Sequence, residues 1–265
     1  MMTPKNDIPF VFFGSPPIGP IALRVLEQNK YMPAAIVTDT KLTTDEQVAI
    51  VEENKAGFIL VVGYGAILKQ GLLDSVAGQA LNIHPSMLPL YRGPAPVVQA
   101  ILDGVKETGV SLMQIDSKMD HGDIVAQESH LLHGKETPDE LYELLTQKGA
   151  RLFLENIDAY LNEEIDLIPQ FDFEATFTKF ITKEDGHINL NDDPQTNERK
   201  IRAYQGWPGA WLTCEGKRLI IHSAHLAEDK LWLDEVQPES SKRMSFAAFA
   251  AGKRMKPEEL YEKLR

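Results

Sequence analysis

The stretch IPFVFFGSPPIGPIALRVLEQN, residues 8–29, decides the fold class. It begins with an apolar run that ends at Gly14, as a buried parallel strand does. Ser15-Pro16-Pro17 then predicts a turn, and the apolar spacing from Ile21 to Leu26 predicts a helix over 20–29. Because a strand, a turn and a helix in this order open a βαβ unit, a parallel sheet is expected.

The same alternation continues outward from this stretch to about residue 161. Thr44 is expected to cap the helix over 44–55, and Thr137 to cap a long helix that begins with Pro138. The pattern predicts a Rossmann-like, mostly parallel sheet with helices on both faces, whose ligands bind beyond the carboxyl ends of its strands. Strands are expected over 8–13, 34–37, 58–62, 80–83, 110–115 and 124–129, and helices over 20–29, 44–55, 66–76, 97–104 and 137–161.

A second domain is predicted after a break in this pattern. Residues 162–176 are polar and lack a helical period, and they are expected to be a linker. Short β-like pieces follow, separated by Gly, Asp and Pro, and they predict a small OB-like β-barrel. The expected division is therefore a domain over 1–161, the linker 162–176 and a C-terminal domain over 177–265.

Composition narrows the class of protein. The chain has 265 residues, 43% of them hydrophobic and 25% charged, which is ordinary for a soluble globular protein. A single cysteine, Cys214, excludes an intramolecular disulfide and a cysteine-based metal cluster. No signal peptide is expected in residues 1–17, where Lys5 is the sole basic residue, and no window is apolar enough to span a membrane. A cytoplasmic monomer is expected.

The net charge of −12 argues at first against a nucleic-acid partner, but the charge is unevenly distributed. Residues 1–169 carry 12 basic and 23 acidic side chains, whereas residues 170–265 carry 15 and 16. From Glu239 onward seven basic residues face four acidic ones. A contact between the C-terminal part and a polyanion is therefore compatible with the sequence.

Asn82, His84 and Asp120 stand at predicted strand ends or loops and form the candidate catalytic group. An amide and a protonated imidazole can hold the oxyanion that forms when a carbonyl becomes tetrahedral, and a carboxylate can orient the histidine and accept a proton. No G-x-S-x-G nucleophile motif is present, so direct attack on a bound acyl donor is the simplest route. Each residue alone also fits a plainer role: Asn82 as a strand cap, His84 as a packed ring and Asp120 as a loop aspartate.

Two motifs around this group resemble a known family. They are NIHPSMLPLYRGPAP, residues 82–96, and TGVSLMQIDSKMDHGDIVAQ, residues 108–127, in which the aspartate follows the asparagine by 38 positions. The chain resembles the formyltransferases that use 10-formyltetrahydrofolate, and within them the members that act on methionyl-tRNA. Further matching segments lie at 12–26, 58–73, 177–190, 201–213 and 233–252.

The resemblance implies roles for particular residues. Asn82 would donate to the formyl oxygen, His84 would stabilise the oxyanion, and Asp120 would orient His84 and accept the amine proton. The implied donor contacts are Ser86, Met87, Leu88, Pro89, Ile67, Leu68 and Asp116, and the implied acceptor contacts are Ser15, Pro16, Tyr64, Lys41 and Arg92.

The sequence departs from the family in two places that the family uses to bind tRNA. Residues 39–57 fill a space where the family has a longer basic insertion with a further strand and helix, and Lys41 is the one cation at the start of this segment. Residues 223–238 also make a shorter β segment than usual.

The function implied is formyl transfer from 10-formyltetrahydrofolate to the methionine amine of initiator Met-tRNA. Two alternatives stay open: formylation of another primary amine, such as a nucleotide-linked amino sugar, and a non-catalytic folate- or RNA-binding relative. His121 is either a second proton shuttle or a solvated loop residue, and Trp207 and Trp211 either stack on a base or belong to the core. The pairs Lys242-Arg243 and Lys253-Arg254 either contact phosphates or are solvated, and no metal is expected.

Overall fold

The computed structural model describes residues 7–265, so the part of the signal-peptide interpretation that concerns residues 1–6, Lys5 included, lies outside the described residues. The chain divides into two compact units. Among the described residues, the first comprises 7–97, 107–131 and 139–179, and the second comprises 98–106, 132–138 and 180–265. Within residues 7–265, no helix has both the length and the apolar character that crossing a bilayer demands.

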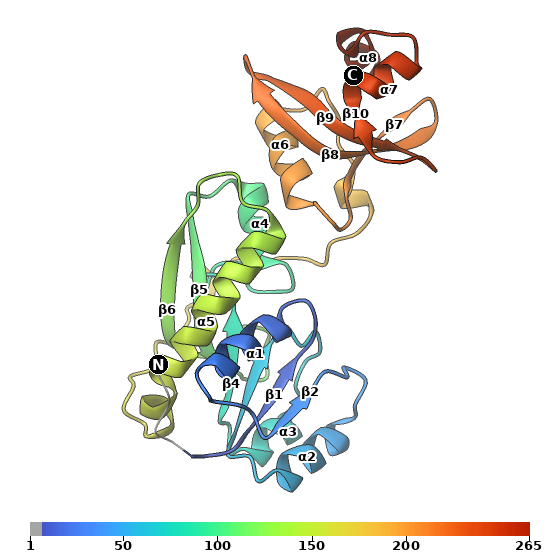
Figure 1. Ribbon diagram of the computed structural model, residues 1–265. Helices are drawn as coiled ribbons and strands as arrows, with labels where there is room; N and C mark the ends of the chain where they lie inside the picture. Colours follow the sequence, from blue (N-terminus) through green and yellow to red (C-terminus); the bar gives the residue numbers. More distant parts are fainter. Residues whose placement is uncertain (1–6) are drawn as a thin grey trace. The chain divides into compact units, whose positions relative to one another are not determined.

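A six-stranded sheet forms the centre of the first unit, in the order β2-β1-β3-β4-β5-β6 (Figure 1). The first four strands are parallel, and β5 and β6 are antiparallel to their neighbours. The prediction of a mostly parallel sheet is thus confirmed, with each predicted strand within a few residues of its observed bounds. The strands are β1 (Phe10–Gly14), β2 (Ala35–Val37), β3 (Phe58–Val62), β4 (Ala80–His84), β5 (Glu107–Gln114) and β6 (Ile124–Leu131).

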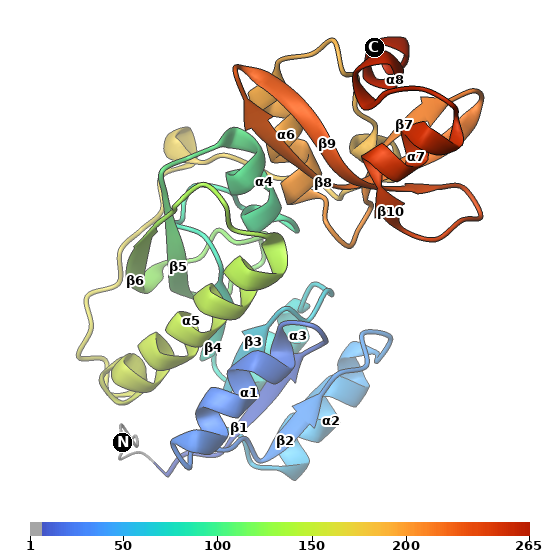
Figure 2. The same ribbon diagram turned by 45° about the horizontal axis from the view of Figure 1, so that its top comes forward.

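Helices cover both faces of this sheet (Figure 1, Figure 2). α1 (Gly19–Gln28) and α5 (Pro138–Leu161) lie on one face, where Phe153 of α5 packs against Phe10 and Phe58 at ring-centroid distances of 6.1 and 6.2 Å. α2 (Thr44–Glu53) and α3 (Gln70–Ser75) cover the other face and contribute Val51 and Leu72 to a second apolar cluster. The near-continuous hydrophobic runs of β1 and β3 follow from this double burial.

The start of α2 corrects one sequence prediction. Thr43, not Thr44, is the N-cap: its hydroxyl accepts from the Glu46 N–H at 3.3 Å, and the Glu46 carboxylate accepts from the Thr43 N–H at 2.7 Å. Capping from Thr44 would put Gln47 in the reciprocal position, but Gln47 is buried and donates to the Tyr64 hydroxyl at 3.2 Å. The capping box therefore forms one residue earlier.

The expected linker belongs by its contacts to the first unit. Ile168 exchanges two backbone hydrogen bonds with Ile124, at 2.8 and 2.9 Å. Further along, the Arg92 N–H donates to the Thr176 carbonyl at 2.9 Å, and the Thr178 N–H donates to the Arg92 carbonyl at 2.7 Å. Residues 162–179 thus run along the sheet and the proline-rich loop, with a short 3-10 turn, η1 (Asp172–Glu174).

The second unit contains a four-stranded antiparallel sheet, in the order β10-β9-β8-β7, in agreement with the expected β-rich C-terminal part. Glu228 and Asp229 join β8 to β9 with φ of +52° and +56°, the conformation of a two-residue hairpin turn. Residues 186–190, one of the short β-like pieces expected after the linker, make one isolated bridge, between His187 and Trp211, instead of a strand. The strands are β7 (Ala210–Cys214), β8 (Lys217–Ala227), β9 (Lys230–Pro238) and β10 (Met244–Ser245).

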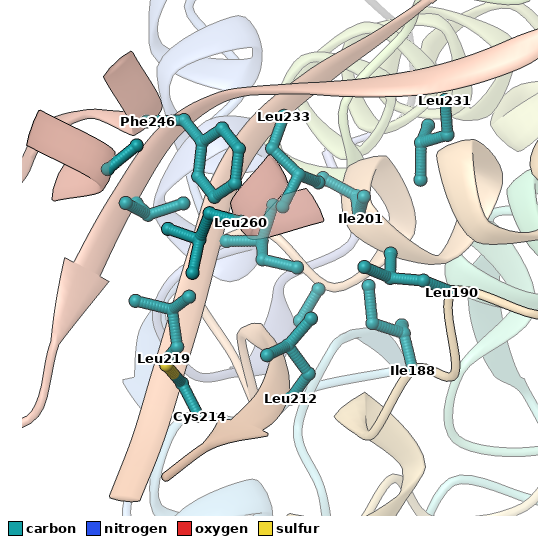
Figure 3. Packing of buried hydrophobic residues seen from close by; sticks show 14 residues of the cluster. Ile188, Leu190, Ile201, Leu212, Cys214, Leu219, Leu231, Leu233, Phe246 and Leu260 are labelled. Atoms are coloured by element: carbon teal, nitrogen blue, oxygen red, sulfur yellow. The ribbon is translucent and has the colours of Figure 1, made fainter. Parts of the chain in front are cut away.

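Helices that the sequence analysis did not predict close the core of the second unit. Ile201, Phe246 and Leu260 come from three different helices and pack with the apolar side chains of the sheet (Figure 3). Such a small sheet cannot bury its inner face alone, so the helices supply the second layer. They are α6 (Pro194–Ala203), α7 (Phe246–Gly252) and α8 (Pro257–Leu264), while α4 (Pro96–Asp103) and the 3-10 turn η2 (Glu184–Gly186) complete the set of elements.

Candidate active site

Asn82 and His84 lie at the carboxyl end of β4, where they are expected. They are two residues apart in a strand, so their side chains point to the same face of the sheet. β4 pairs with the antiparallel β5, which places Met113 opposite Asn82 and Ser111 opposite His84. His84 is 5% exposed, whereas Asn82 is partly exposed.

Asp120 lies in the loop between β5 and β6 and faces both of these residues. Its Oδ1 is 3.4 Å from Asn82 Nδ2 and 3.6 Å from His84 Nδ1. Its backbone φ is +49°, a left-handed conformation that few residues other than glycine adopt. The three predicted side chains thus converge, although Asp120 is 38 positions from Asn82 in the sequence.

The two oxygens of Asp120 have different surroundings. Oδ2 accepts a hydrogen bond from the Gly93 N–H at 2.8 Å. Oδ1 faces the amide of Asn82 and the ring of His84. Since Oδ2 is held by the backbone, Oδ1 is the oxygen placed to orient the imidazole or to accept a proton.

The hydrogen bond of His84 determines its tautomer. Nε2 lies 3.1 Å from the Tyr91 carbonyl oxygen, which can only accept, so Nε2 carries the hydrogen and donates. Nδ1 is then the nitrogen that gains or loses a proton, and it is the one facing Asp120. The ring can accordingly present either a lone pair or an N–H on the side of Asn82 and Asp120.

Ser111, on the neighbouring strand β5, fixes the proline-rich segment after β4 by hydrogen bonds. The Ser111 hydroxyl donates to the Ser86 carbonyl at 2.6 Å and accepts from the Leu88 N–H at 3.0 Å. The Gln127 amide donates to the Leu88 carbonyl at 2.9 Å and to the Ser111 hydroxyl at 2.8 Å. These bonds hold residues 86–88 rigidly beside His84.

The predicted donor contacts differ in exposure. Ser86 and Leu88 are buried, and the Ser86 hydroxyl donates to the Leu90 carbonyl at 2.6 Å. Ile67 is 71% exposed, whereas its neighbour Leu68 is 5% exposed and belongs to the apolar cluster under the sheet. Met87 and Pro89 are partly exposed. Ile67, in the loop after β3, and Met87 and Pro89, in the segment after β4, thus have exposed surface, whereas Ser86 and Leu88 are buried in that second segment.

Asp116 and His121 form an ion pair in the same loop as Asp120. Asp116 Oδ2 lies 2.6 Å from His121 Nδ1, and Asp116 Oδ1 accepts from the Lys118 N–H at 2.8 Å. His121 Nε2 is 3.6 Å from Asp172 Oδ1. His121 is a partly exposed loop residue, and none of these contacts directs it at the Asp120 carboxylate.

The predicted acceptor contacts fall into two groups. Pro16 and Lys41 are exposed, and the Ser15 hydroxyl donates to the Thr38 carbonyl at 3.1 Å. Tyr64 and Arg92 are each 2% exposed and have internal partners. The Tyr64 hydroxyl donates to the Asp39 carbonyl at 2.6 Å. The contact of all five residues with an acceptor stays a prediction. The internal bonds of Tyr64 and Arg92 show in addition that these two side chains hold neighbouring segments of the chain in place.

Arg92 has an extended set of internal contacts. Its Nη1 donates to Asp172 Oδ1 at 2.9 Å and its Nε donates to Gln170 Oε1 at 3.0 Å. The hydrogen bond from Arg92, reinforced by the nearby charges of His121 and Lys118, lowers the pKa of Asp172. Arg92 Nη2 is buried without a hydrogen-bond partner.

Sequence reasoning missed three groups that touch the candidate catalytic residues: the Tyr91 carbonyl, the Gly93 N–H and the side chain of Gln170. Two of them are backbone groups, which carry no residue-type signal. Gln170 lies 50 positions from Asp120 in a segment that the sequence presents as a polar linker. Gly93, with a φ of +116° and the Thr178 carbonyl 2.8 Å from where a Cβ would stand, was the one usable signal.

The smaller predictions of the sequence analysis have mixed outcomes. Trp207 is 57% exposed, while the Trp211 indole donates to the Lys183 carbonyl at 3.0 Å and lies under the Arg218 guanidinium. Arg243 and Lys253 form ion pairs with Glu235 and Glu215. Among residues 7–265 no cluster of three or more potential metal ligands occurs.

Comparison with known proteins finds family matches in both the N-terminal and the C-terminal part of the chain. Residues 17–157 match the family model described as formyl transferase, and residues 180–231 match that of its C-terminal domain. A methionyl-tRNA formyltransferase of Roseiflexus castenholzii is 38% identical over 80% of this chain and 67% of its own length. One of Chloroflexus aggregans is 39% identical over 73% of this chain and 71% of its own length.

Solved structures share the fold. A methionyl-tRNA formyltransferase of Clostridium thermocellum has a TM-score of 0.67 at 20% identity, over 87% of this chain and 99% of that one. HypX from Aquifex aeolicus, solved with tetrahydrofolic acid, has a TM-score of 0.71 at 18% identity, over 92% of this chain and 47% of that one. At these identities the likeness concerns the fold alone. The family match over more than half of the sequence shows that the chain belongs to the formyltransferase family and is a formyl-transferring enzyme.

Proposed function

We propose that this enzyme transfers the formyl group of 10-formyltetrahydrofolate to the amino group of methionine on initiator Met-tRNA. The observation that carries the proposal is Asp120 Oδ1, which lies 3.4 Å from the Asn82 amide and 3.6 Å from the His84 ring. A donor, a ring nitrogen and a carboxylate within this distance suit attack of an amine on a carbonyl without an acyl-enzyme.

Asn82 and His84 stabilise the developing negative charge. The Asn82 amide has two N–H groups, so one can contact Asp120 while the other donates to the formyl oxygen. His84 donates through Nδ1 when that nitrogen is protonated, because Nε2 is bonded to the Tyr91 carbonyl. Both donors are fixed before the reaction, which saves the cost of reorganising them as charge develops.

Asp120 removes the proton. Its Oδ1, which lies 3.6 Å from His84 Nδ1, accepts a proton from the attacking amine, directly or through water. The hydrogen bond from Gly93 to Oδ2 keeps the carboxylate in this orientation. Loss of the proton prevents the amine from leaving again, so the tetrahedral adduct would collapse by breaking the bond between the formyl carbon and N10 of the folate. N10 would take up a proton from His84 Nδ1 or from water, and tetrahydrofolate would leave.

The residues around the site fit a formylated folate, which when bound supplies the electrophilic formyl carbon. A pteridine ring needs apolar surface, and Ile67 is 71% exposed although it is apolar. Met87 and Pro89 offer further partly exposed surface on a segment held in place by Ser111 and Gln127. This rigidity would keep the formyl carbon at a constant distance from Asn82 and His84.

The acceptor is inferred from the relatives. The two relatives above and one of Neisseria meningitidis serogroup C, 31% identical over 78% of this chain, are all named methionyl-tRNA formyltransferase. We assign catalysis to the domain expected over 1–161 and tRNA contacts to the domain over 177–265, in a cytoplasmic monomer. Ser15, Pro16, Tyr64, Lys41 and Arg92 remain the predicted acceptor contacts.

A second acceptor is favoured by one observation. β2 connects to α2 through residues 38–43 alone, where the sequence lacks the long basic insertion of its family. An N-formyltransferase of Helicobacter canadensis, solved with folinic acid and dTDP-3-aminofucose, shares the fold with a TM-score of 0.64 over 83% of this chain and 88% of that one, at 19% identity. An amino sugar linked to a nucleotide is accordingly the alternative acceptor.

An acceptor assay separates the two proposals. The purified protein is incubated with donor labelled in the formyl group, and with either initiator Met-tRNA or a dTDP-linked amino sugar. Label in the Met-tRNA fraction, absent when the methionine amine is already acylated, is expected. Label confined to the amino sugar would replace the proposed acceptor, and release of formate with neither acceptor would contradict both.

A further inference from the structure

The loop that carries Asp120 is gripped by a residue from the segment expected to be a linker. Gln170 Nε2 donates to the Asp120 carbonyl at 3.1 Å and to the Gly122 carbonyl at 2.7 Å. One amide group, with its two N–H donors, therefore spans the residues on either side of His121. The contact is to the backbone of Asp120, so it acts on the position of the whole residue.

The orientation of the Gln170 amide is determined by its other end. Oε1 accepts from Arg92 Nε at 3.0 Å. A flipped amide would present its oxygen to two carbonyl oxygens and its NH₂ group to a guanidinium, and all three contacts would be lost. Arg92, which is 2% exposed and bonded to Asp172 at 2.9 Å, keeps this arrangement in place.

Asp120 needs such support because its backbone is strained. A φ of +49° is unfavourable for a residue with a Cβ, and it persists where the surroundings determine it. Gln170 holds the main chain of Asp120, and the Gly93 N–H holds Oδ2. Both contacts trace back to the neighbouring residues Arg92 and Gly93.

We infer that Gln170 is a positioning residue for catalysis: it aims Oδ1 of Asp120 at Asn82 and His84 by fixing the backbone of Asp120 from the segment 162–179. The inference rests on the proposed role of Asp120 in formyl transfer. None of these bonds joins Gln170 to Asn82 or His84, so its effect on the candidate catalytic group is transmitted through the loop that carries Asp120.

The test compares turnover of Gln170→Ala and Gln170→Glu with the unaltered enzyme. Gln170→Glu keeps an oxygen that accepts from Arg92 but loses both N–H donors. It therefore measures the effect of losing the two hydrogen bonds to the Asp120 loop while the bond to Arg92 remains. Each variant should lower kcat by about tenfold to about a hundredfold, with KM for donor and acceptor changed by less than about threefold. Gln70→Ala is the matched control, since Gln70 is exposed and its amide donates to Asp74, away from the loop of Asp120 in the sequence.

A double-mutant cycle distinguishes positioning from a general effect on folding. If Gln170 acts through Asp120, Gln170→Ala should cost nothing further in an Asp120→Asn background. Thermal unfolding of each variant, followed by circular dichroism, shows whether lost turnover reflects lost structure. Gln170→Glu retains the bond to Arg92 and provides a folded variant if Gln170→Ala unfolds.

Two results would overturn the inference alone: wild-type turnover in both Gln170 variants beside an impaired Asp120→Asn, or an additive loss in the double variant. Full turnover in Asp120→Asn would instead remove the proposed role of Asp120, and with it the reason for positioning that residue.

Discussion

At the scale of single residues, the chemistry depends on which atoms are already engaged. His84 uses Nε2 for the Tyr91 carbonyl, and Asp120 uses Oδ2 for the Gly93 N–H. The other atom of each pair is not bonded to the backbone in this way: His84 Nδ1 and Asp120 Oδ1 lie 3.6 Å apart, and Oδ1 lies 3.4 Å from the Asn82 amide. In the proposed mechanism, these backbone hydrogen bonds determine which atom of each side chain is available for the reaction.

Asp120→Asn tests the role of this carboxylate. The amide side chain is nearly isosteric but cannot accept the amine proton, so kcat should fall by about a hundredfold to about ten-thousandfold. Turnover is measured at saturating donor, and the unfolding midpoint is followed by circular dichroism. Asp74→Asn, on the exposed surface of α3, should leave both quantities unchanged. Near-wild-type turnover in Asp120→Asn would contradict a proton-accepting role.

At the scale of elements, short-range hydrogen bonds decide where a helix begins and which way a segment lies. α2 starts with a reciprocal pair between Thr43 and Glu46. The expected linker, in contrast, is held by partners far away in the sequence: Ile168 pairs with Ile124, and Gln170 with Asp120 and Gly122. The helix that is fixed by neighbours in sequence was predicted with its cap one residue off, whereas the contacts of the expected linker, which depend on distant partners, were not predicted.

The pair Thr43 and Thr44 offers a matched test of the cap. Thr43→Ala removes the hydroxyl that accepts from the Glu46 N–H and should lower the free energy of unfolding by about 1 kcal/mol. Thr44→Ala, one position inside the helix, should have an effect near zero. Both values are obtained from urea unfolding followed by circular dichroism. A larger loss for Thr44→Ala would contradict the observed capping box.

At the scale of the whole molecule, the distribution of charge determines how strongly the protein would attract the phosphates of a tRNA. The net charge is −12, yet it is concentrated in residues 1–169. Within the basic pairs near the end of the chain, Arg243 and Lys253 form ion pairs with Glu235 and Glu215. Lys242 and Arg254 are exposed and are the cations of these pairs that we expect to meet phosphate. Contacts with phosphate are thus expected to be few and to depend on Lys242 and Arg254.

Salt titration of initiator tRNA binding tests this expectation. Each phosphate contact contributes a slope of about −0.9 to the logarithm of affinity against the logarithm of salt concentration. The double variant Lys242→Ala with Arg254→Ala should weaken binding and make the slope less negative by about 1 to about 2. Lys30→Ala, in the first unit, is the control for a general loss of charge. An unchanged slope in the double variant would show that tRNA is held elsewhere.

Most of the fold of the first unit could be predicted because its signals are local. The apolar runs of 58–62 and 80–84 and the helix start at 137–140 mark elements that lie within a few residues of their predicted bounds. The helices of the second unit were missed, since α7 and α8 are short and follow a region of clear β pattern. The apolar residues of these helices are buried only where they pack against the sheet, so their role depends on contacts between distant parts of the chain.

The sequence by itself determined the class of the fold, the identity of Asn82, His84 and Asp120 as the candidate catalytic group, and the family. Residue types at fixed spacing carry that information. Only the tertiary structure decided which atoms of those residues are free to react, which tautomer His84 adopts and that Gln170 and Arg92 hold the loop of Asp120. The physical reason is that backbone N–H and C=O groups make most of these contacts. Every residue except proline carries the same backbone N–H and C=O groups, so the amino-acid sequence does not show which of these groups contact a given side chain; only the folded structure does.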